Sequence, residues 1–217
     1  MDSGLPYLDR KKAILIDDTI ASGRTSAAAK AVTGIERLAV VYAAPEAINE
    51  TDICAEVLPF PHLLEWNFWN SWYCPSIYCD IDGLCCPDPP LEVVGDKDRY
   101  LKWIEDVLPY DGPRKNPIAG FVTCRPRFAE AHTRRWLDKH GFRYQMLVMA
   151  DSWITDLHAQ AKWKASVLAA LSARFYIESS EIMAELLRAE LNRRGCLTLV
   201  SVPRRSAVYG EFSGWRA

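Results

Sequence analysis

The sequence lacks the features that mark membrane and exported proteins. No apolar run approaches the roughly 20 residues that a transmembrane helix needs, and the first residues, MDSGLPYLDRKK, lack the charged-then-apolar layout of a signal peptide. It also lacks an excess of one charge, because 26 Lys and Arg residues against 28 Asp and Glu residues leave a formal net charge of -2. That balance gives no general electrostatic reason to bind nucleic acid or an anionic membrane. We therefore expect a cytoplasmic protein with no nucleic-acid or membrane partner.

The spacing of a structural zinc site is missing as well. The chain has seven cysteines, an odd number, so at least one lies outside any intrachain disulfide. Cys74, Cys79, Cys85 and Cys86 cluster with His62 upstream, but they contain no C-x2-C pair. In a reducing compartment we expect seven free thiols, some of them serving as small apolar residues in strands.

The chain of 217 residues fits one large or two small domains, and its 49% apolar and 25% charged residues are ordinary for a protein with a buried core. There is no internal repeat and no low-complexity stretch. We predict an α/β fold in two units: residues 1–60, a Trp-rich linker at 61–75, a second unit at 76–204 and a C-terminal tail at 205–217. In the first unit, strands are predicted at 13–16, 37–44 and 53–58, with a helix at 25–32. In the second, strands are predicted at 76–79, 118–123, 144–150, 174–177 and 197–202, and helices at 100–107, 127–140, 157–171 and 182–194. Such regular alternation favours a parallel sheet covered by helices.

Polar side chains follow three strands of the predicted second sheet. Ligands of such sheets bind at the carboxyl ends of the strands. The residues at these ends are Asp80, Asp82, Thr123 and Glu178, the last followed by Ser179 and Ser180. The helix at 157–171 adds Lys162 and Lys164. These residues are expected to meet in one crevice.

Four segments of the second unit, CDIDG, FVTCRP, AKWKA and FYIESS, occur in this order. Together they resemble the four motifs of the haloacid-dehalogenase-like phosphohydrolases. The resemblance covers residues 76 to about 203 and implies a Rossmann-like core with a parallel sheet. The segment between the first two motifs, about residues 85–117, is too short for a large cap domain. The site is therefore expected to have a minimal cap, and to be open or covered by the first unit.

Carried over residue by residue, the resemblance implies a role for each matching side chain. Asp80 would be the nucleophile that becomes an aspartyl-phosphate, and Asp82 the general acid and then the base. Thr123 would hydrogen-bond the phosphoryl group, and Lys164, with Lys162 as the alternative, would neutralise charge at the nucleophile. The implied substrate is a small phosphomonoester, either a sugar phosphate or a nucleoside or ribosyl phosphate. The chemistry is reasonable because a carboxylate nucleophile splits a difficult hydrolysis into two steps, and cations offset the negative phosphate.

The implied cofactor is Mg²⁺, which prefers oxygen ligands. The resemblance places Asp80, Asp82 and Glu178 around it. Many relatives carry a second acid in the last motif, but ESS offers only Glu178, with Glu181 a helical step away. Weaker metal binding, or an enzyme-like fold without activity, is consistent with this departure.

Each of these residues also has a purely structural interpretation. The Asp pair before Gly83 is compatible with a simple turn, Thr123 with a helix cap, Glu178 and its serines with an N-cap, and the lysines with a solvated helix face. The protein could also be a binding or scaffold module. On that interpretation Trp66, Trp69 and Trp72 would form an apolar surface for another protein, whereas the alternative is that they join the two units.

The segment ILIDDTIASGRT in the first unit resembles the phosphoribosyl-diphosphate motif of type I phosphoribosyltransferases, over residues 13 to about 60. The resemblance implies that Asp17 and Asp18 take ribose hydroxyls. The turn at 21–25 would wrap a 5′-phosphate, with hydroxyls from Ser22 and Thr25, backbone donors, and conformational freedom from Gly23. Arg24 stands where the family usually has Gly. The alternative is a plain strand-to-helix turn capped by Ser or Thr.

Only twelve residues precede this motif, so the family's pyrophosphate-binding and catalytic loops have no counterpart in the chain. We expect a C-terminal transferase fragment fused to a phosphatase. The chain would be an artificially truncated protein, a reduced natural form, or one part of a split enzyme. Its N-terminal loop would bind phosphoribosyl diphosphate or ribose phosphate without transferring it. A homo-oligomer or a separate N-terminal partner would complete the small first unit.

Overall fold

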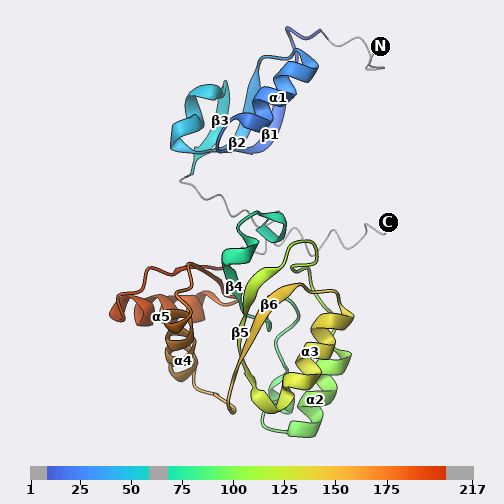
Figure 1. Cartoon of the computed structure of the whole chain (residues 1–217), viewed down its shortest axis with the longest axis vertical. Coiled ribbons are helices and arrows are strands. Elements are labelled where there is room, and N and C mark those ends of the chain that lie inside the picture. The colour runs from blue at the N-terminus through green and yellow to red at the C-terminus, as the bar shows by residue number, and fades with distance from the viewer. Residues whose placement is uncertain (1–8, 59–67, 204–217) are drawn as a thin grey trace. The chain divides into compact units, whose positions relative to one another are not determined.

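The computed structural model describes residues 9–58 and 68–203, and the chain divides into two compact units, Met1–Leu64 and Glu65–Ala217 (Figure 1). Each unit has its own parallel sheet. The α/β class predicted from the sequence is thus confirmed for both. None of the helices within the described ranges is long and apolar enough to cross a membrane.

The first unit is a small three-stranded parallel sheet in the order β1-β2-β3. Its elements are β1 (Leu15–Ile20), α1 (Arg24–Thr33), β2 (Leu38–Ala43), the 3-10 helix η1 (Pro45–Glu50) and β3 (Ile53–Val57). The core combines Leu38 and Val40 of the central strand with Ile20 of β1 and Ala47 of η1. Leu38 and Val40 are two residues apart on β2, so both side chains point to the same face of the sheet and are buried in this core.

The second unit is a five-stranded parallel sheet with four helices. Its strands are β4 (Ile77–Cys79), β5 (Ile118–Pro126), β6 (Tyr144–Ala150), β7 (Phe175–Ile177) and β8 (Leu199–Ser201). Its helices are α2 (Lys97–Asp106), α3 (Glu130–Lys139), α4 (Leu157–Ala170) and α5 (Glu181–Arg193), with short 3-10 helices η2 (Phe68–Asn70), η3 (Cys74–Ser76), η4 (Leu91–Val93) and η5 (Arg127–Ala129).

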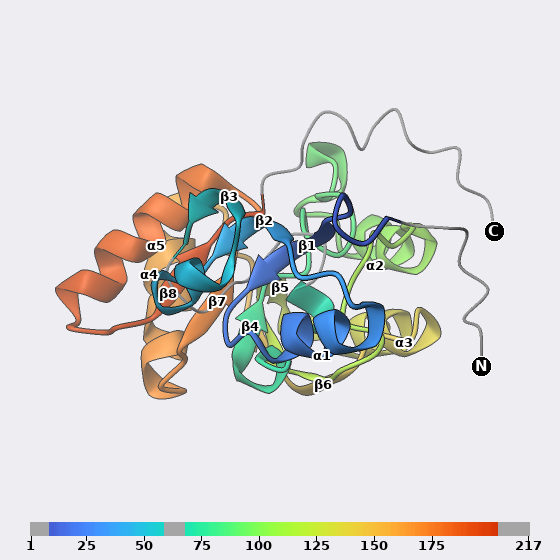
Figure 2. The ribbon, with the colours of Figure 1, turned by 90° about the horizontal axis from the view of Figure 1, so that it is seen from above.

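The strand order β6-β5-β4-β7-β8 reverses direction at β4. The chain moves outward from β4 to β5 and β6, and then returns to the other side of β4 to form β7 and β8. The pair α2 and α3 therefore covers one face, and the pair α4 and α5 covers the other (Figures 1 and 2). In open α/β sheets, the crevice beyond the carboxyl ends of the strands at such a reversal is the usual ligand site.

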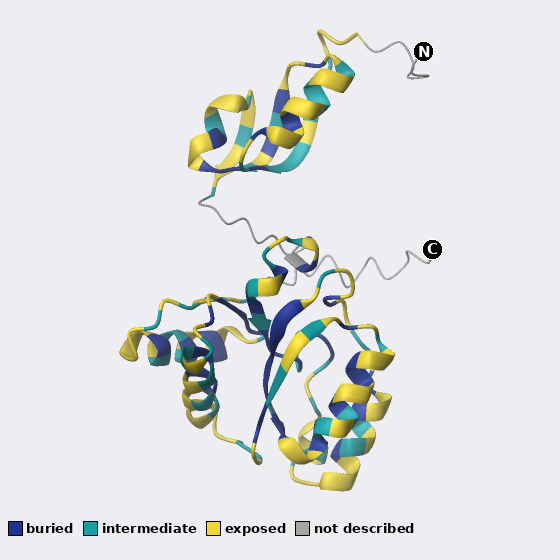
Figure 3. Ribbon diagram, in the orientation of Figure 1, coloured by how far each residue is buried: buried dark blue, intermediate teal, exposed yellow. Residues whose placement is uncertain are grey.

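The interior strands are buried along their length, as expected for a parallel sheet covered on both faces (Figure 3). β5 has one close approach to its neighbour β6, at Gly120. A Cβ atom there would lie 2.6 Å from the backbone oxygen of Met146. Glycine is therefore required for β5 and β6 to pair at this point.

The described part of the predicted Trp-rich linker, residues 68–75, is part of the second unit rather than a free connection. Trp69 is buried, and its carbonyl accepts a hydrogen bond from the thiol of Cys74 at 3.2 Å. The ring of Tyr73 packs edge-on against Phe175 of β7, with ring centroids 5.6 Å apart. Trp72 is 73% exposed, and Trp66 lies outside the described residues.

Candidate functional site

A buried ammonium group joins two carboxylates at the carboxyl ends of β4 and β7. Lys164 of α4 donates hydrogen bonds to Asp80 Oδ2 at 2.5 Å and to Glu178 Oε2 at 2.7 Å. Lys164, Asp80 and Glu178 are only 2%, 7% and 1% exposed. The strand ends are tied together as well, because the Asp80 N–H donates to the Ile177 carbonyl at 3.0 Å. Three residues that are far apart in the sequence thus form one charged centre at the reversal of strand order.

Burial and charge act in opposite directions on this centre. Burial alone would lower the pKa of Lys164, but the nearby charge of Asp80, with further contributions from Tyr176 and Glu178, raises it well above its usual value. Burial raises the pKa of Glu178, and the Lys164 charge only partly opposes that shift. Lys164 therefore keeps its positive charge between the two carboxyl groups.

Asp82 is held by a buried arginine. Arg125 of β5 donates from Nη2 to Asp82 Oδ1 at 2.6 Å and from Nε to Oδ1 and Oδ2 at 3.1 Å each. The guanidinium group also donates to Thr133 Oγ1 at 3.4 Å and to the sulfur of Cys86 at 3.3 Å. Two indole rings flank it, with its Cζ 5.4 Å from the ring of Trp103 and 5.7 Å from that of Trp136. Such forked pairing fixes the carboxylate more firmly than an ammonium would.

Thr123 is buried on β5 and lies in the same cleft as Asp80 and Asp82. Its hydroxyl oxygen accepts the backbone N–H of Arg125 at 3.3 Å. Between Thr123 and Pro126 the pairing register of β5 with β6 shifts, an irregularity that re-aims side chains at many active sites. The cleft has a volume of about 390 Å³ and contains all five predicted site residues of the second unit.

The purely structural interpretations fit some of the predicted site residues and not others. Lys164 is buried in the cleft, whereas Lys162 is exposed on α4 and fits the solvated-face interpretation. Ser180 is the N-cap of α5 and accepts the Met183 N–H at 3.4 Å, so the N-cap does not need Glu178. Glu181 pairs with Arg188 at the surface, 2.8 Å away, and adds nothing to the cleft. Gly83 does take a left-handed turn, with a φ of 71°, so the turn and the site coexist.

Two of the three predicted magnesium ligands converge and the third is engaged elsewhere. Among the described residues, no group of three or more His, Cys, Asp and Glu side chains is arranged to hold a metal ion. Asp80 and Glu178 share the Lys164 ammonium, while Asp82 is paired with Arg125. Mg²⁺ is commonly held by one or two carboxylates together with water and substrate phosphate. The Asp80–Glu178 pair fits that pattern.

In the first unit, Asp17 and Asp18 lie inside β1 rather than after it, because the strand continues to Ile20. Consecutive residues of a strand point to opposite faces of the sheet. The side chain of Asp18 nevertheless interacts with that of Asp17, so the proximity of the two carboxyl groups does not depend on their lying at the end of the strand. Burial, followed by the charge of Asp18, raises the pKa of Asp17, while the Asp18 N–H donates to it at 2.9 Å and lowers that pKa.

The predicted phosphate loop has the expected backbone but a carboxylate beside it. Gly23 is the N-cap of α1, with a φ of 68°, and no side chain caps the helix. The structure therefore does not show the alternative cap by Ser or Thr: Ser22 and Thr25 are exposed. A Cβ atom at Gly23 would lie 1.9 Å from the Glu50 Oε2 atom. An incoming phosphate would meet this negative group at the start of α1.

Several residues that shape the site were not predicted from the sequence. Arg125 lay within the quoted segment FVTCRP but received no role, although an arginine two residues after Thr123 projects from the same strand end. Cys124, Tyr100 and Trp153 also line the cleft. No local pattern indicates Tyr100 or Trp153, since each comes from an element that reaches the cleft only through the fold.

The comparisons with known proteins add no relative to this description. No family model, curated protein or solved structure matches the chain.

Proposed function

We propose that the second unit is a magnesium-dependent phosphatase that hydrolyses a small phosphomonoester through Asp80. The observation that carries the proposal is the Lys164 ammonium, buried and bonded to both Asp80 and Glu178 at the reversal of the strand order. A buried cation beside a cleft-facing carboxylate is the arrangement that phosphoryl transfer to a carboxylate requires. It lets the nucleophile approach an anionic ester in a site of low dielectric constant.

The proposed reaction has two steps, both at Asp80. One oxygen of Asp80 attacks phosphorus, and the bond from phosphorus to the alcohol oxygen breaks, which leaves an aspartyl-phosphate. The departing oxygen takes up a proton, for which Asp82 is the proposed donor, and leaves as the alcohol. Water then attacks the aspartyl-phosphate and releases inorganic phosphate, which restores the Asp80 carboxylate. Lys164 stays hydrogen-bonded beside the reacting carboxylate and neutralises part of its charge. Thr123, in the same cleft, is placed to donate its hydroxyl to a phosphoryl oxygen.

The metal would be held by Asp80 and Glu178. When bound, Mg²⁺ would neutralise charge on the phosphoryl oxygens. Ser179 supports this pair, because its N–H and hydroxyl both donate to Glu178 Oε1, at 2.9 and 3.2 Å. The other Glu178 oxygen bonds Lys164, so the carboxylate is fixed from both sides.

Asp82 is the proposed proton donor, and its pairing with Arg125 sets a condition on that role. Both of its oxygens accept hydrogen bonds from the guanidinium group. Asp82 must therefore turn away from Arg125 before it can give a proton to the leaving oxygen. Asp82 and Arg125 both line the cleft, so such a rotation would remain within it.

The test is release of inorganic phosphate from a panel of sugar and nucleoside phosphates, with and without Mg²⁺. Asp80→Asn should abolish turnover. Its fold should persist because Lys164 keeps its bond to Glu178, and circular dichroism would check this. The matched control is Asp151→Asn, an exposed acid that pairs with Arg127 at the surface, which should keep full activity. A phosphoryl group on the peptide that contains Asp80 would mark the intermediate. Wild-type turnover by Asp80→Asn would refute the proposal.

If the protein is instead a binding or scaffold module, it should release no phosphate from any ester of the panel. We assign no transfer reaction to the first unit, because Glu50 lies against Gly23 where phosphoribosyl diphosphate or ribose phosphate would bind. Base-dependent release of pyrophosphate, lost on combining Asp17→Asn with Asp18→Asn, would contradict that assignment.

A further inference from the structure

The cleft above the charged centre has an apolar wall. We call the buried charged residues Asp80, Lys164 and Glu178 its floor, and its lining also includes a set of hydrocarbon and aromatic side chains. The apolar side chains come from three separate parts of the fold: Pro89, Leu91, Val94, Tyr100, Trp153 and Leu157. A bare sugar phosphate would fill the polar floor and leave this wall in contact with water.

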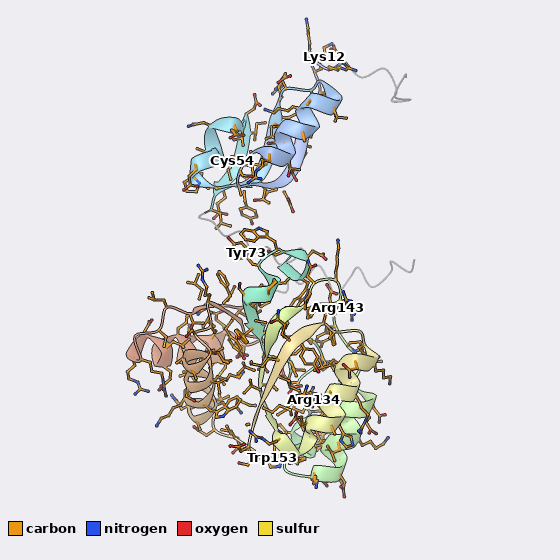
Figure 4. All side chains as sticks on the ribbon, viewed as in Figure 1. Lys12, Cys54, Tyr73, Arg134, Arg143 and Trp153 are labelled. Carbon is orange, nitrogen blue, oxygen red and sulfur yellow. The ribbon has the colours of Figure 1, made fainter. Side chains whose placement is uncertain are left out.

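Trp153 forms the aromatic part of that wall. It follows β6 at the carboxyl end of the sheet, where Figure 4 labels it. Tyr100 meets it edge to face, with ring centroids 4.7 Å apart and planes at 70°. Phe128 does the same at 5.5 Å and 66°. Trp153 is nevertheless only partly buried, so some of its indole surface remains for a ligand.

The segment that carries Trp153 is held in place by its neighbours. The side chain of Gln160 donates to the Ile154 carbonyl at 2.6 Å. Asp156 caps α4 by accepting the Ala159 N–H at 2.7 Å. A rigid aromatic side chain binds a flat ring with little loss of conformational entropy. The wall therefore has the character of a preformed stacking surface.

We propose that the phosphomonoester taken by this cleft is a nucleoside monophosphate, whose base stacks on Trp153 while its phosphate lies at Asp80 and Lys164. This inference rests on the proposed phosphatase function and names its substrate class. A nucleotide combines three features that match residues lining the cleft: an anion for the floor, hydroxyls for polar side chains such as Gln160 and Thr155, and a flat ring for the wall. A volume of about 390 Å³ falls within the usual range for small-molecule sites.

The test compares adenosine 5′-monophosphate with ribose 5-phosphate, two substrates that differ only in the base. Stacking on an aromatic side chain corresponds to a preference on the order of five- to 150-fold. We expect the wild-type kcat/KM to favour the nucleotide by such a factor. In Trp153→Leu the ratio of the two kcat/KM values should fall towards one. The ratio is independent of the amount of folded enzyme, because both rates scale with it.

The matched control is Trp72→Leu, which removes an indole that does not line the cleft and should leave the ratio unaltered. A wild-type ratio near one, or a preference that survives Trp153→Leu, would overturn the inference while leaving the phosphatase proposal intact. Failure to hydrolyse every member of the panel of sugar and nucleoside phosphates would instead sink the phosphatase proposal. In that case calorimetric titration of the full chain with the same two compounds decides the inference. Tighter binding of the nucleotide that depends on Trp153 supports it, and equal binding rejects it.

Discussion

Removing the charge of Arg125 should destabilise the second unit more than any surface ion pair could. The change is Arg125→Met, which keeps much of the side-chain volume. Arg125 is 1% exposed, and the Asp82 side chain is 16% exposed, so the change leaves a carboxylate in a poorly hydrated place. Breaking a buried pair from one side costs about 3–5 kcal/mol. The contacts support the upper part of that range, because Arg125 makes three hydrogen bonds to Asp82 and lies between two indoles.

The assay is urea unfolding followed by far-UV circular dichroism, with the midpoint read for the transition of the second unit. The control is Arg127→Met, two residues along, whose pairing with Asp151 is exposed at 65% and 83% and should contribute about 0–1 kcal/mol. Domain stability is typically about 5–15 kcal/mol, so Arg125→Met could be too unstable to purify. Arg125→Lys then provides the measurement, since it keeps the charge but loses the fork, and should cost about 1.5–3 kcal/mol.

The double variant Arg125→Met with Asp82→Leu tests the ion pair as a whole. It removes both charges together, and should recover much of the stability lost in Arg125→Met. A loss below about 1 kcal/mol for Arg125→Met, equal to that of the exposed control, would refute the reasoning. It would mean that Asp82 remains well solvated without its partner.

Two further predictions concern the thiol of Cys124 and the backbone at Gly120. Burial raises the pKa of Cys124 to about 12, with the nearby Lys164 charge opposing that shift and the Asp80 and Glu178 charges adding to it. Its alkylation by iodoacetamide at pH 8 should therefore be roughly a thousandfold slower than that of an ordinary cysteine. Its rate should keep rising about tenfold per pH unit up to pH 10, and levelling near pH 9, seen by peptide mass spectrometry, would contradict the shift. Gly120→Ala would place a methyl group 2.6 Å from the Met146 carbonyl oxygen and should cost about 1–3 kcal/mol by urea unfolding, whereas unchanged stability would show that β5 and β6 separate easily.

Periodicity and strand-end chemistry predict most of the second unit. The predicted strands and helices are all present there, with bounds shifted by a few residues. Asp80 and Glu178 meet in one cleft because each follows a strand of a parallel sheet, where topology brings strand ends together. Thr123 was predicted to end its strand, but β5 continues to Pro126, and Thr123 lies three residues before that end. The ion pair between Arg125 and Asp82 could not be predicted from the sequence, because it depends on the packing of β5 against the turn after β4.

The first unit shows where local reasoning fails. The pair Asp17-Asp18 marks the end of a strand by composition, since acidic residues are rare within strands. Pairing of Asp17 with Val40 and of Thr19 with Tyr42 nevertheless extends β1 past both acids. Tertiary pairing therefore overrode the local preference. Glu50 belongs to η1, a 3-10 helix with no periodic signal, so its approach to Gly23 could not be predicted from the motif.

The central strand β4 has a consequence for the order in which the molecule assembles. β4 is only three residues long, and its two partners come from much later in the chain. Asp82 and Arg125 are 43 positions apart, and Asp80 and Lys164 are 84 apart. Contacts of such separation form late and slowly, because long loops must close first. The charged centre is therefore expected to form last during folding, after β5 and β6 have paired. For the same reason it should be among the first parts lost when the native state opens locally. Catalytic activity would therefore indicate that the whole sheet has formed.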